Sequence, residues 1–304
     1  MKDDFSWRAL VRGALIATSA ALLVPALSAG VAPMARAATP AERSVVGESA
    51  ADGAGKPETP APSVNPFTTA AMRAYLASRR GGITGAVLNL ANHKLYLYRP
   101  GVTEQTASIV KVDILETLLH AEQASFHPLD GDDEALATGM IEASDNDDAT
   151  DLWDEVGGAA AIARFDALAG LTDTMPNTDG YWGETMTTAL DQVRLLERLV
   201  VANTLLDRSS RAYELGLMEN VIPYDRWGVC AGPAPGVTVA LKNGWVPIVN
   251  GDWQINSIGY VSGDGRDYLV AILTDGNPTE GYGIATIEGI SRIIWSRIVL
   301  IPER

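Results

Sequence analysis

The order in which strand-like and helix-like segments follow one another constrains the fold of this chain more than any other feature of its sequence. Runs of β-branched or alternating apolar residues, the pattern of strands, lie at 83–90, 94–98, 237–243, 253–262 and 267–274. Apolar residues with helical spacing fill most of 107–220 and also mark 67–79 and 284–298. This order predicts an α+β fold in which an antiparallel sheet is flanked by N- and C-terminal helices and carries an all-helical lobe at about 107–220. We expect a cleft between the sheet and that lobe.

The first 66 residues are predicted to lie outside this fold. A basic N-terminus precedes an apolar run at 14–31, and Ala35-Arg36-Ala37 is a small-x-small cleavage sequence, so we interpret 1–37 as a signal peptide. A retained membrane anchor is the alternative, because the run is nearly long enough to span a bilayer. Residues 38–66 are rich in Ala, Gly, Pro, Ser, Thr and Glu and lack apolar periodicity, which predicts a disordered linker. The sequence thus predicts one folded domain, 67–304, in a secreted, extracytoplasmic protein of the cell envelope.

The charge balance and the few cysteine and histidine residues exclude several classes of function. Removal of the leader, with its four basic and two acidic residues, lowers the net charge from −15 to −17, which argues against nucleic acid and anionic lipid as partners. Cys230 is the sole cysteine and has no basic residue beside it, so we interpret it as a small apolar residue. The three histidines lack metal-ligand spacing and no Gly-x-Ser-x-Gly sequence is present, which disfavours a metal site and a Ser-His-Asp triad. We expect a monomer without a metal or cofactor.

Ser108 and Lys111 are the first candidates for chemistry. Apolar residues with helical spacing follow Ser108, which places it near the first turn of a buried helix with Lys111 on the same face. A serine hydroxyl needs an adjacent base to become a nucleophile, and a lysine becomes a base when burial or another cation lowers its pKa. The alternative is a capping serine beside a solvated lysine.

Two further short motifs are informative because of their order along the chain. Ser144-Asp145-Asn146 lies where one predicted helix meets the next, a place where these residue types also serve as N-caps. Lys242-Asn243-Gly244 lies at the end of a predicted strand, and by itself it is compatible with any exit into a turn. Ser-x-x-Lys at a helix start, Ser-Asp-Asn in a helical lobe and Lys-x-Gly on a late strand together form the signature of class A β-lactamases and penicillin-binding proteins. Over residues 67–304 the chain resembles this family of active-site serine hydrolases.

The resemblance implies a role for each catalytic residue of the signature. Ser108 is implied to be the nucleophile that becomes acylated, and Lys111 the amine that takes or relays its proton. Ser144 is implied to pass that proton to the leaving nitrogen, while Asn146 holds Lys111 and the substrate. Lys242 is implied to supply positive potential for a substrate carboxylate and to help keep Lys111 neutral.

The strand that carries Lys242 is implied to bind the substrate through Asn243, Gly244 and Trp245. The oxyanion is implied to lie between the backbone N–H groups of Ser108 and Trp245. Asn243 departs from the family, which has a threonine or serine hydroxyl there; an amide still donates to a carboxylate, but with a differently aimed group. This leaves the choice of substrate open. Four aromatic residues are equally compatible with lining the cleft and with an ordinary core, namely Tyr181, Trp182, Trp227 and Trp245.

The segment 171–182 departs from class A β-lactamases, which carry there a glutamate that activates the deacylating water. This segment contains no glutamate, and Asp173 and Asp179 are the candidate substitutes. Glu184 matches the family's loop-closing acidic position, for which a structural ion pair is the favoured role. We therefore expect an acyl-enzyme that forms with β-lactams or D-alanyl-type amides and esters and hydrolyses slowly. The alternative is a non-catalytic envelope module that keeps the cleft as a binding site.

Overall fold

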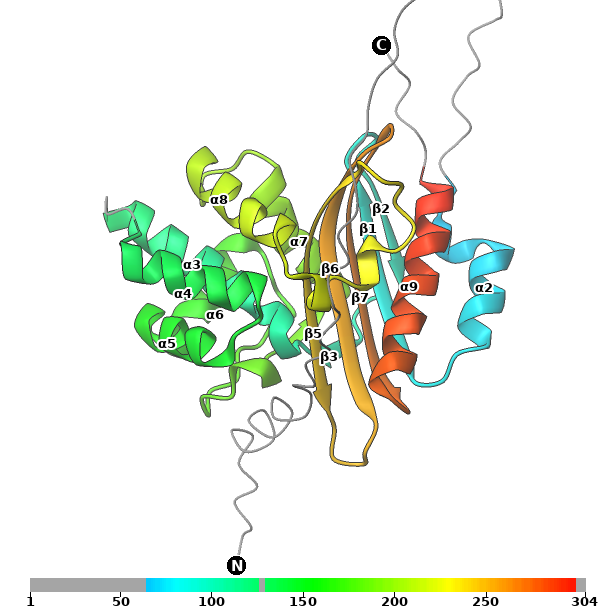
Figure 1. Ribbon diagram of the computed structural model, residues 1–304, viewed down its shortest axis with the longest axis horizontal. Coiled ribbons are helices and arrows are strands. Elements are labelled where there is room, and N and C mark those ends of the chain that lie inside the picture. The colour runs from blue at the N-terminus through cyan, green and yellow to red at the C-terminus, as the bar shows by residue number, and fades with distance from the viewer. Residues whose placement is uncertain (1–63, 126–128, 299–304) are drawn as a thin grey trace, which may run out of the picture. The chain divides into compact units, whose positions relative to one another are not determined.

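The main sheet of the protein has five antiparallel strands in the order β2-β1-β7-β6-β5. We describe a computed structural model, in which residues 64–125 and 129–298 are placed. The strands are β1 (Gly82–Asn89), β2 (Lys94–Tyr98), β5 (Thr238–Pro247), β6 (Trp253–Gly263) and β7 (Arg266–Asn277). Strands from the start of the folded chain thus pair with strands from its end, as the sequence predicts, and β5 forms one edge of the sheet (Figure 1).

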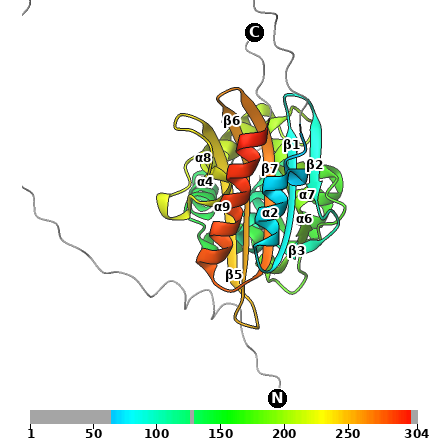
Figure 2. The ribbon, with the colours of Figure 1, turned by 90° about the vertical axis from the view of Figure 1, so that its right-hand side faces the viewer.

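Two helices from opposite ends of the folded chain cover one face of the sheet, α2 (Ala70–Ala77) and α9 (Glu280–Arg297) (Figure 2). Before α2, the short 3-10 helix η1 (Pro66–Thr68) buries Phe67. Strand residues such as Val270 and Ile272 form one apolar cluster with Ile287 of α9. Burial of this apolar surface joins the terminal segments of the domain into one layer.

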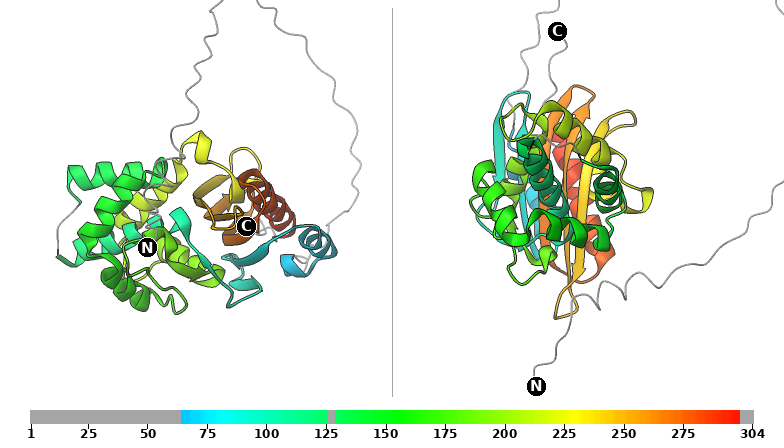
Figure 3. Two further views of the ribbon diagram at one scale, coloured as in Figure 1. Left: turned by 90° about the horizontal axis from the view of Figure 1, so that it is seen from below. Right: turned by 90° about the vertical axis from the view of Figure 1, so that its left-hand side faces the viewer.

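The other face of the sheet carries the helical lobe (Figures 1 and 3). Its helices are α3 (Val110–Ser125), α4 (Gly131–Glu142), α5 (Asn146–Val156), α6 (Gly158–Ala169), α7 (Ala189–Val200) and α8 (Arg208–Glu219). Helix α7 packs on the sheet, against β1, β6 and β7, whereas α4, α5, α6 and α8 all contact α3. Every residue of α3 from Val110 to Leu119 is buried. The helix that follows the candidate serine is therefore the central element of the lobe.

The predicted architecture is confirmed, apart from a small two-stranded sheet that the sequence pattern did not predict. The helix predicted at 187–202 begins at Ala189, because Met186–Thr188 forms strand β4, which pairs with β3 (Thr103–Gln105). Both strands have three residues, too few to show an alternating pattern in the sequence. This small sheet brings the chain just before Ser108 next to the end of the segment 171–185.

The predicted signal peptide, 1–37, and all but the last three residues of the predicted linker, 38–66, lie outside the described residues. Helical structure begins at Pro66, where the side chain of Asn65 accepts a hydrogen bond from the N–H of Phe67 (2.9 Å). None of the helices in the described part of the chain is long and apolar enough to cross a membrane.

Candidate active site

Ser108 lies in a short 3-10 helix, η2 (Ala107–Ile109), that continues into α3. Ala107 has a φ of +46°, a left-handed conformation that is uncommon for alanine. Ser108 is half-buried, and Lys111 follows in the first turn of α3 with its side chain buried. The predicted helix start is confirmed, except that the serine precedes the α-helix on a tighter turn.

The amino group of Lys111 is enclosed and makes three hydrogen bonds. Its Nζ donates to the backbone oxygen of Ser144 (2.6 Å), to the Oγ of Ser144 (3.2 Å) and to the Oδ1 of Asn146 (2.8 Å). Burial lowers the pKa of Lys111 well below its usual value, and the positive charge of Lys242 lowers it further. The environment thus favours the neutral amine, which has hydrogens for only two of these three contacts at a time and is the form that accepts a proton.

Ser144 occupies the turn between α4 and α5, with a φ of +54°. The next residue, Asp145, is the N-cap of α5, since its carboxylate accepts hydrogen bonds from the N–H groups of Asp147 (2.8 Å) and Asp148 (3.0 Å). The capping interpretation therefore holds for the middle residue of the motif. Ser144 and Asn146, on either side of the cap, turn to Lys111 instead.

Lys242 reaches the same turn from the edge strand β5. Its Nζ donates to the Oγ of Ser144 (2.8 Å) and to the backbone oxygen of Asn243 (3.2 Å), and the residue is 1% exposed. Burial lowers the pKa of Lys242 to about 8, although the charge of Asp225 opposes the shift. Two buried amines therefore meet at one hydroxyl, and these contacts join the sheet edge to the helical lobe.

Gly244 brings the backbone of β5 against the backbone of Ser108. A Cβ atom on Gly244 would lie 2.8 Å from the nitrogen of Ser108 and 2.7 Å from the oxygen of Thr106, so only glycine allows this approach. The N–H of Ser108 thus lies beside the strand that carries Trp245. The Trp245 side chain lies on the opposite face of β5, where it packs edge-on against Trp227 at a ring-centre distance of 5.9 Å.

Asn243 is placed differently from the substrate-binding role that we expected. It is 1% exposed, and its Nδ2 donates to the backbone oxygens of Asp225 (2.7 Å) and Trp227 (3.0 Å). Both amide hydrogens are used by these bonds, so the side chain has no donor left for a substrate carboxylate. The reason is strand alternation, which turns Asn243 to the face opposite Lys242 and Gly244.

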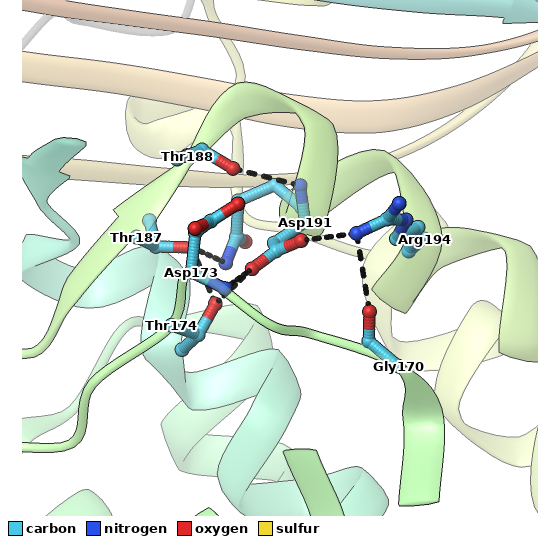
Figure 4. A network of polar contacts seen from close by, with 8 residues as sticks. Gly170, Asp173, Thr174, Thr187, Thr188, Asp191 and Arg194 are labelled. Carbon is cyan, nitrogen blue, oxygen red and sulfur yellow. Dashed lines mark hydrogen bonds and ion pairs between the residues drawn. The ribbon is translucent and has the colours of Figure 1, made fainter. Parts of the chain in front are cut away.

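The loop between α6 and β4, residues 171–185, is held at its base by Asp191 of α7 (Figure 4). Asp191 is 0% exposed, and its Oδ2 accepts from the N–H of Asp173 (2.7 Å) and the hydroxyl of Thr174 (3.1 Å). Its Oδ1 forms an ion pair with Arg194 (2.9 Å). At the other end of the loop, the carbonyl of Thr185 accepts the N–H of Thr106 (2.8 Å). The loop is thus fastened both to α7 and to the turn that carries Ser108.

None of the acidic residues singled out in this loop is buried. Asp173 and Asp179 are exposed. Glu184 is half-buried, and its Oε2 accepts a hydrogen bond from the Nδ2 of Asn177 (3.3 Å). Within residues 64–125 and 129–298 Glu184 forms no ion pair, so the structural ion pair expected for it is replaced by this hydrogen bond.

Trp182 belongs to the site more closely than the sequence indicated. It is 2% exposed, its Nε1 donates to the Oγ1 of Thr150 (3.2 Å), and its ring centre lies 5.0 Å from the Nζ of Lys111. Cys230, by contrast, joins the apolar cluster under α9, and burial raises the pKa of its thiol. This environment agrees with the interpretation of Cys230 as an apolar residue. In the described part of the chain, no three His, Cys, Asp or Glu side chains are grouped so that they could hold a metal ion.

Three segments, which carry Lys111, Ser144 and Lys242, meet at the hydroxyl of Ser144. This site, in a fold made of an antiparallel sheet and a helical lobe, defines the β-lactamase-like class of proteins. The chain belongs to the Beta-lactamase enzyme family, whose family model matches residues 132–298. It is similar to a protein of Mycobacterium tuberculosis named "Putative lipoprotein LppW", at 28% identity over 228 residues that cover 71% of this chain and 72% of the relative.

Three solved structures illustrate the shared fold. A class A β-lactamase from Bacteroides cellulosilyticus is 18% identical, with a TM-score of 0.66 and coverage of 74% of this chain and 94% of that chain. The TLA-1 extended-spectrum β-lactamase is 16% identical, with a TM-score of 0.67 and coverage of 74% and 95%. PBP-A is 21% identical, with a TM-score of 0.65 and coverage of 75% and 96%.

Proposed function

We propose that the protein is a serine hydrolase that forms an acyl-enzyme through Ser108 with β-lactams or D-alanyl-type amides and esters. The observation that carries this proposal is the enclosed amine of Lys111, three residues from Ser108, which is hydrogen-bonded to the same Ser144 hydroxyl as the buried amine of Lys242. Burial of two amines is costly, and in the described residues neither forms an ion pair. Such a strained electrostatic arrangement is typical of a site where a base is needed.

In the acylation step, the Oγ of Ser108 attacks the substrate carbonyl carbon and its proton passes to the Nζ of Lys111. The carbonyl oxygen becomes an oxyanion, for which the N–H groups of Ser108 and Trp245 are the proposed donors. When the intermediate collapses, the bond from carbon to the leaving nitrogen breaks. Ser144 then donates its hydroxyl proton to that nitrogen and regains one from Lys111, and Lys242 attracts the substrate carboxylate.

In the deacylation step, a water molecule attacks the ester carbon and Ser108 leaves with a proton. The loop supplies no dedicated base for this step, because Asp173 and Asp179 are exposed and Glu184 is bonded to Asn177. A long-lived acyl-enzyme follows. A solved structure of a PBP-A mutant, which has a similar fold, is described as an acyl-enzyme complex with penicillin G. Efficient β-lactamase turnover is not part of the proposal.

We also propose that the domain acts outside the cytoplasm as a monomer, joined by the linker 38–66 to a leader at 1–37. The relative named as a lipoprotein supports a location at the cell envelope. The proposed substrates, β-lactams and peptidoglycan-type peptides, are found in that compartment.

The test is intact-mass spectrometry of the purified domain after incubation with benzylpenicillin. We expect a stable adduct with the mass of the whole penicillin on the wild-type protein and none on Ser108→Ala. Ser78→Ala is the matched control, because Ser78 is an exposed serine at the end of α2 and should leave the adduct unchanged. Peptide mapping should then place the penicilloyl group on Ser108.

Turnover measurements separate the remaining possibilities. Rates on a chromogenic cephalosporin and on a D-alanyl thioester distinguish slow β-lactam hydrolysis from peptidase or esterase activity. If the wild-type protein forms no adduct and hydrolyses neither compound, the catalytic proposal is wrong. The fold then serves as a binding module of the envelope.

A further inference from the structure

Asn256 of β6 lies opposite Gly244 and is bonded to the backbone just ahead of Ser108. Its Nδ2 donates to the carbonyl oxygens of Gln105 (2.8 Å) and Thr106 (3.0 Å). Its Oδ1 accepts the N–H of Thr274 on β7 (3.2 Å), and the residue is 0% exposed. Both donors and the acceptor of this amide are therefore used, and they connect the centre of the sheet to the start of η2.

A second amide of β6, that of Gln254, reaches the same segment. It lies where the pairing of β6 with β7 shifts register, between Trp253 and Ile255. Gln254 is 4% exposed, and its Nε2 donates to the carbonyl oxygen of Gln105 (2.6 Å). Because residues two apart on a strand share a face, Gln254 and Asn256 both face η2, whereas Ile255 enters the apolar cluster under α9.

The segment held by these amides contains a strained residue. A left-handed conformation of an ordinary L-residue costs roughly 1–2 kcal/mol, and such a residue persists only where its surroundings hold it. Ala107 has this conformation, directly between the bonded carbonyl of Thr106 and the backbone nitrogen of Ser108. The direction of the Ser108 N–H therefore depends on how firmly the Thr106 carbonyl is held.

We propose that Asn256 is a positioning residue for acyl transfer, which holds the Gln105 and Thr106 carbonyls so that Ala107 stays left-handed and the Ser108 N–H stays beside Gly244. Gly244 leaves the space for this backbone, and its cross-strand partner Asn256 supplies the hydrogen bonds. Asn256 itself does not touch the substrate. This inference rests on the proposed function, since the N–H that it positions is a proposed oxyanion donor.

The chain offers a matched control for Asn256. Asn277 is also 0% exposed and also an asparagine of the same sheet, and its Nδ2 donates to the oxygen of Trp253 (3.0 Å) and the hydroxyl of Thr274 (2.8 Å). Neither bond reaches η2. Loss of either amide should lower thermal stability, but only loss of Asn256 should affect acylation beyond that.

The kinetic test measures acylation by a fluorescent penicillin in Asn256→Ala, Asn256→Asp and Asn277→Ala. We expect the saturating acylation rate to fall about 100-fold in both Asn256 variants, because a small misplacement of reacting groups has an effect of this size. The half-saturating penicillin concentration should change little. Asn256→Asp keeps the shape of the side chain and an acceptor oxygen, but it cannot donate to both the Gln105 and Thr106 carbonyls. It therefore separates the effect of hydrogen bonding from that of space filling. Asn277→Ala should acylate within about 3-fold of wild type.

Crystal structures of the wild type and the same variants supply a readout that needs no activity. We expect Ala107 to leave the left-handed region in Asn256→Ala and to keep it in Asn277→Ala. The proposal is overturned if the conformation of Ala107 is unchanged in the Asn256 variants or if those variants acylate as fast as wild type. It is also overturned if the acylation rate of Asn277→Ala falls as far as that of the Asn256 variants. If the wild type forms no acyl-enzyme, the proposed function fails, and the conformation of Ala107 still decides whether Asn256 positions this turn.

Discussion

Lys111 and Lys242 donate to the same atom, the Oγ of Ser144, at 3.2 Å and 2.8 Å. Like charges repel strongly when they are removed from water, so the arrangement favours a state in which one amine is neutral. The pKa of Lys111 lies well below its usual value, whereas that of Lys242 is lowered to about 8. Lys111 is therefore suited to be the base and Lys242 the remaining cation, with a hydroxyl between them that can relay a proton.

The rate of acylation should depend on pH with two limbs. As the pH falls through the lowered pKa of Lys111, the amine becomes protonated and the rate should decrease, because the base is lost. As the pH rises through about 8, Lys242 loses its proton and attraction for a carboxylate weakens, so the rate should decrease again for penicillins. Second-order acylation rates measured from pH 5 to 10 check this. An ester substrate without a carboxylate should lack the alkaline limb.

Substitution of Lys242 should move the remaining acidic limb. In Lys242→Met the nearby positive charge is gone, which removes one cause of the lowered pKa of Lys111. The acidic limb for the uncharged ester should therefore shift to higher pH. Lys94→Met on β2 is the control, because Lys94 is exposed. An acidic limb that stays in place in Lys242→Met would contradict the coupling of the two amines.

Ser144 should be required for its hydroxyl. Ser144→Ala removes the group between the two amines, and we expect acylation to slow about 100-fold, the size of effect that a general acid or relay has. Because Ser144 has a φ of +54°, the alanine variant also keeps backbone strain, and Ser144→Gly relieves it. If the hydroxyl is what matters, both variants should be equally slow. Recovery of the rate in Ser144→Gly would assign the loss to strain instead.

Much of the fold and the main site could be predicted because the decisive signals are local. Helical spacing after Ser108 gave the start of α3, and three short motifs in fixed order gave the segments that meet at Ser144. To predict that these segments meet, the register of the sheet did not have to be known. The role of Asn243 did require it, because the face to which a strand residue turns depends on where the strand begins and on its partners.

The residues that support the site could not be found in the same way. Asn256 and Asp191 act through backbone groups more than 15 positions away, and no local pattern in the sequence marks such a contact. One signal was present, however. Gln254 and Asn256 alternate with Ile255 in a predicted strand, and polar residues on the inner face of a strand indicate that they bond to something buried.

Asp191→Asn should loosen the loop 171–185. An asparagine keeps the shape but loses the charge that pairs with Arg194 and strengthens the bonds from Asp173 and Thr174. Because Arg194 is 37% exposed and the pair is partly screened, we expect a loss of about 1–3 kcal/mol in the free energy of unfolding. Relative to wild type, amide hydrogen exchange in the variant should become faster in 171–185, and more so there than in β6. Unchanged exchange in this loop would mean that Asp191 is not its anchor.

Four carboxyl groups are buried together inside the helical lobe, where the positive charge of Arg198 opposes the effect of burial on Glu116 without cancelling it. Asp113 and Glu116 lie on α3, Asp166 on α6 and Glu214 on α8, and each is at most 2% exposed. Burial raises the pKa of Asp113, Glu116 and Glu214 well above the usual values and that of Asp166 to about 7, and neighbouring carboxyl groups add to the shifts of the first three. The folded protein therefore holds protons that the unfolded chain releases above about pH 4.

The protein should consequently become less stable as the pH rises. Where the folded state binds more protons than the unfolded state, the free energy of unfolding falls by about 1.4 kcal/mol per pH unit for each such group, until the pH passes its raised pKa. Asp166 contributes to this loss only up to about pH 7. Glu116→Gln removes one ionisable group, so it should raise stability at pH 8 relative to wild type and much less at pH 5, as measured by urea unfolding. Glu134→Gln changes an exposed glutamate on α4 in the same way and should give equal differences at both pH values. If Glu116→Gln behaves like this control, Glu116 is not held protonated in the folded lobe.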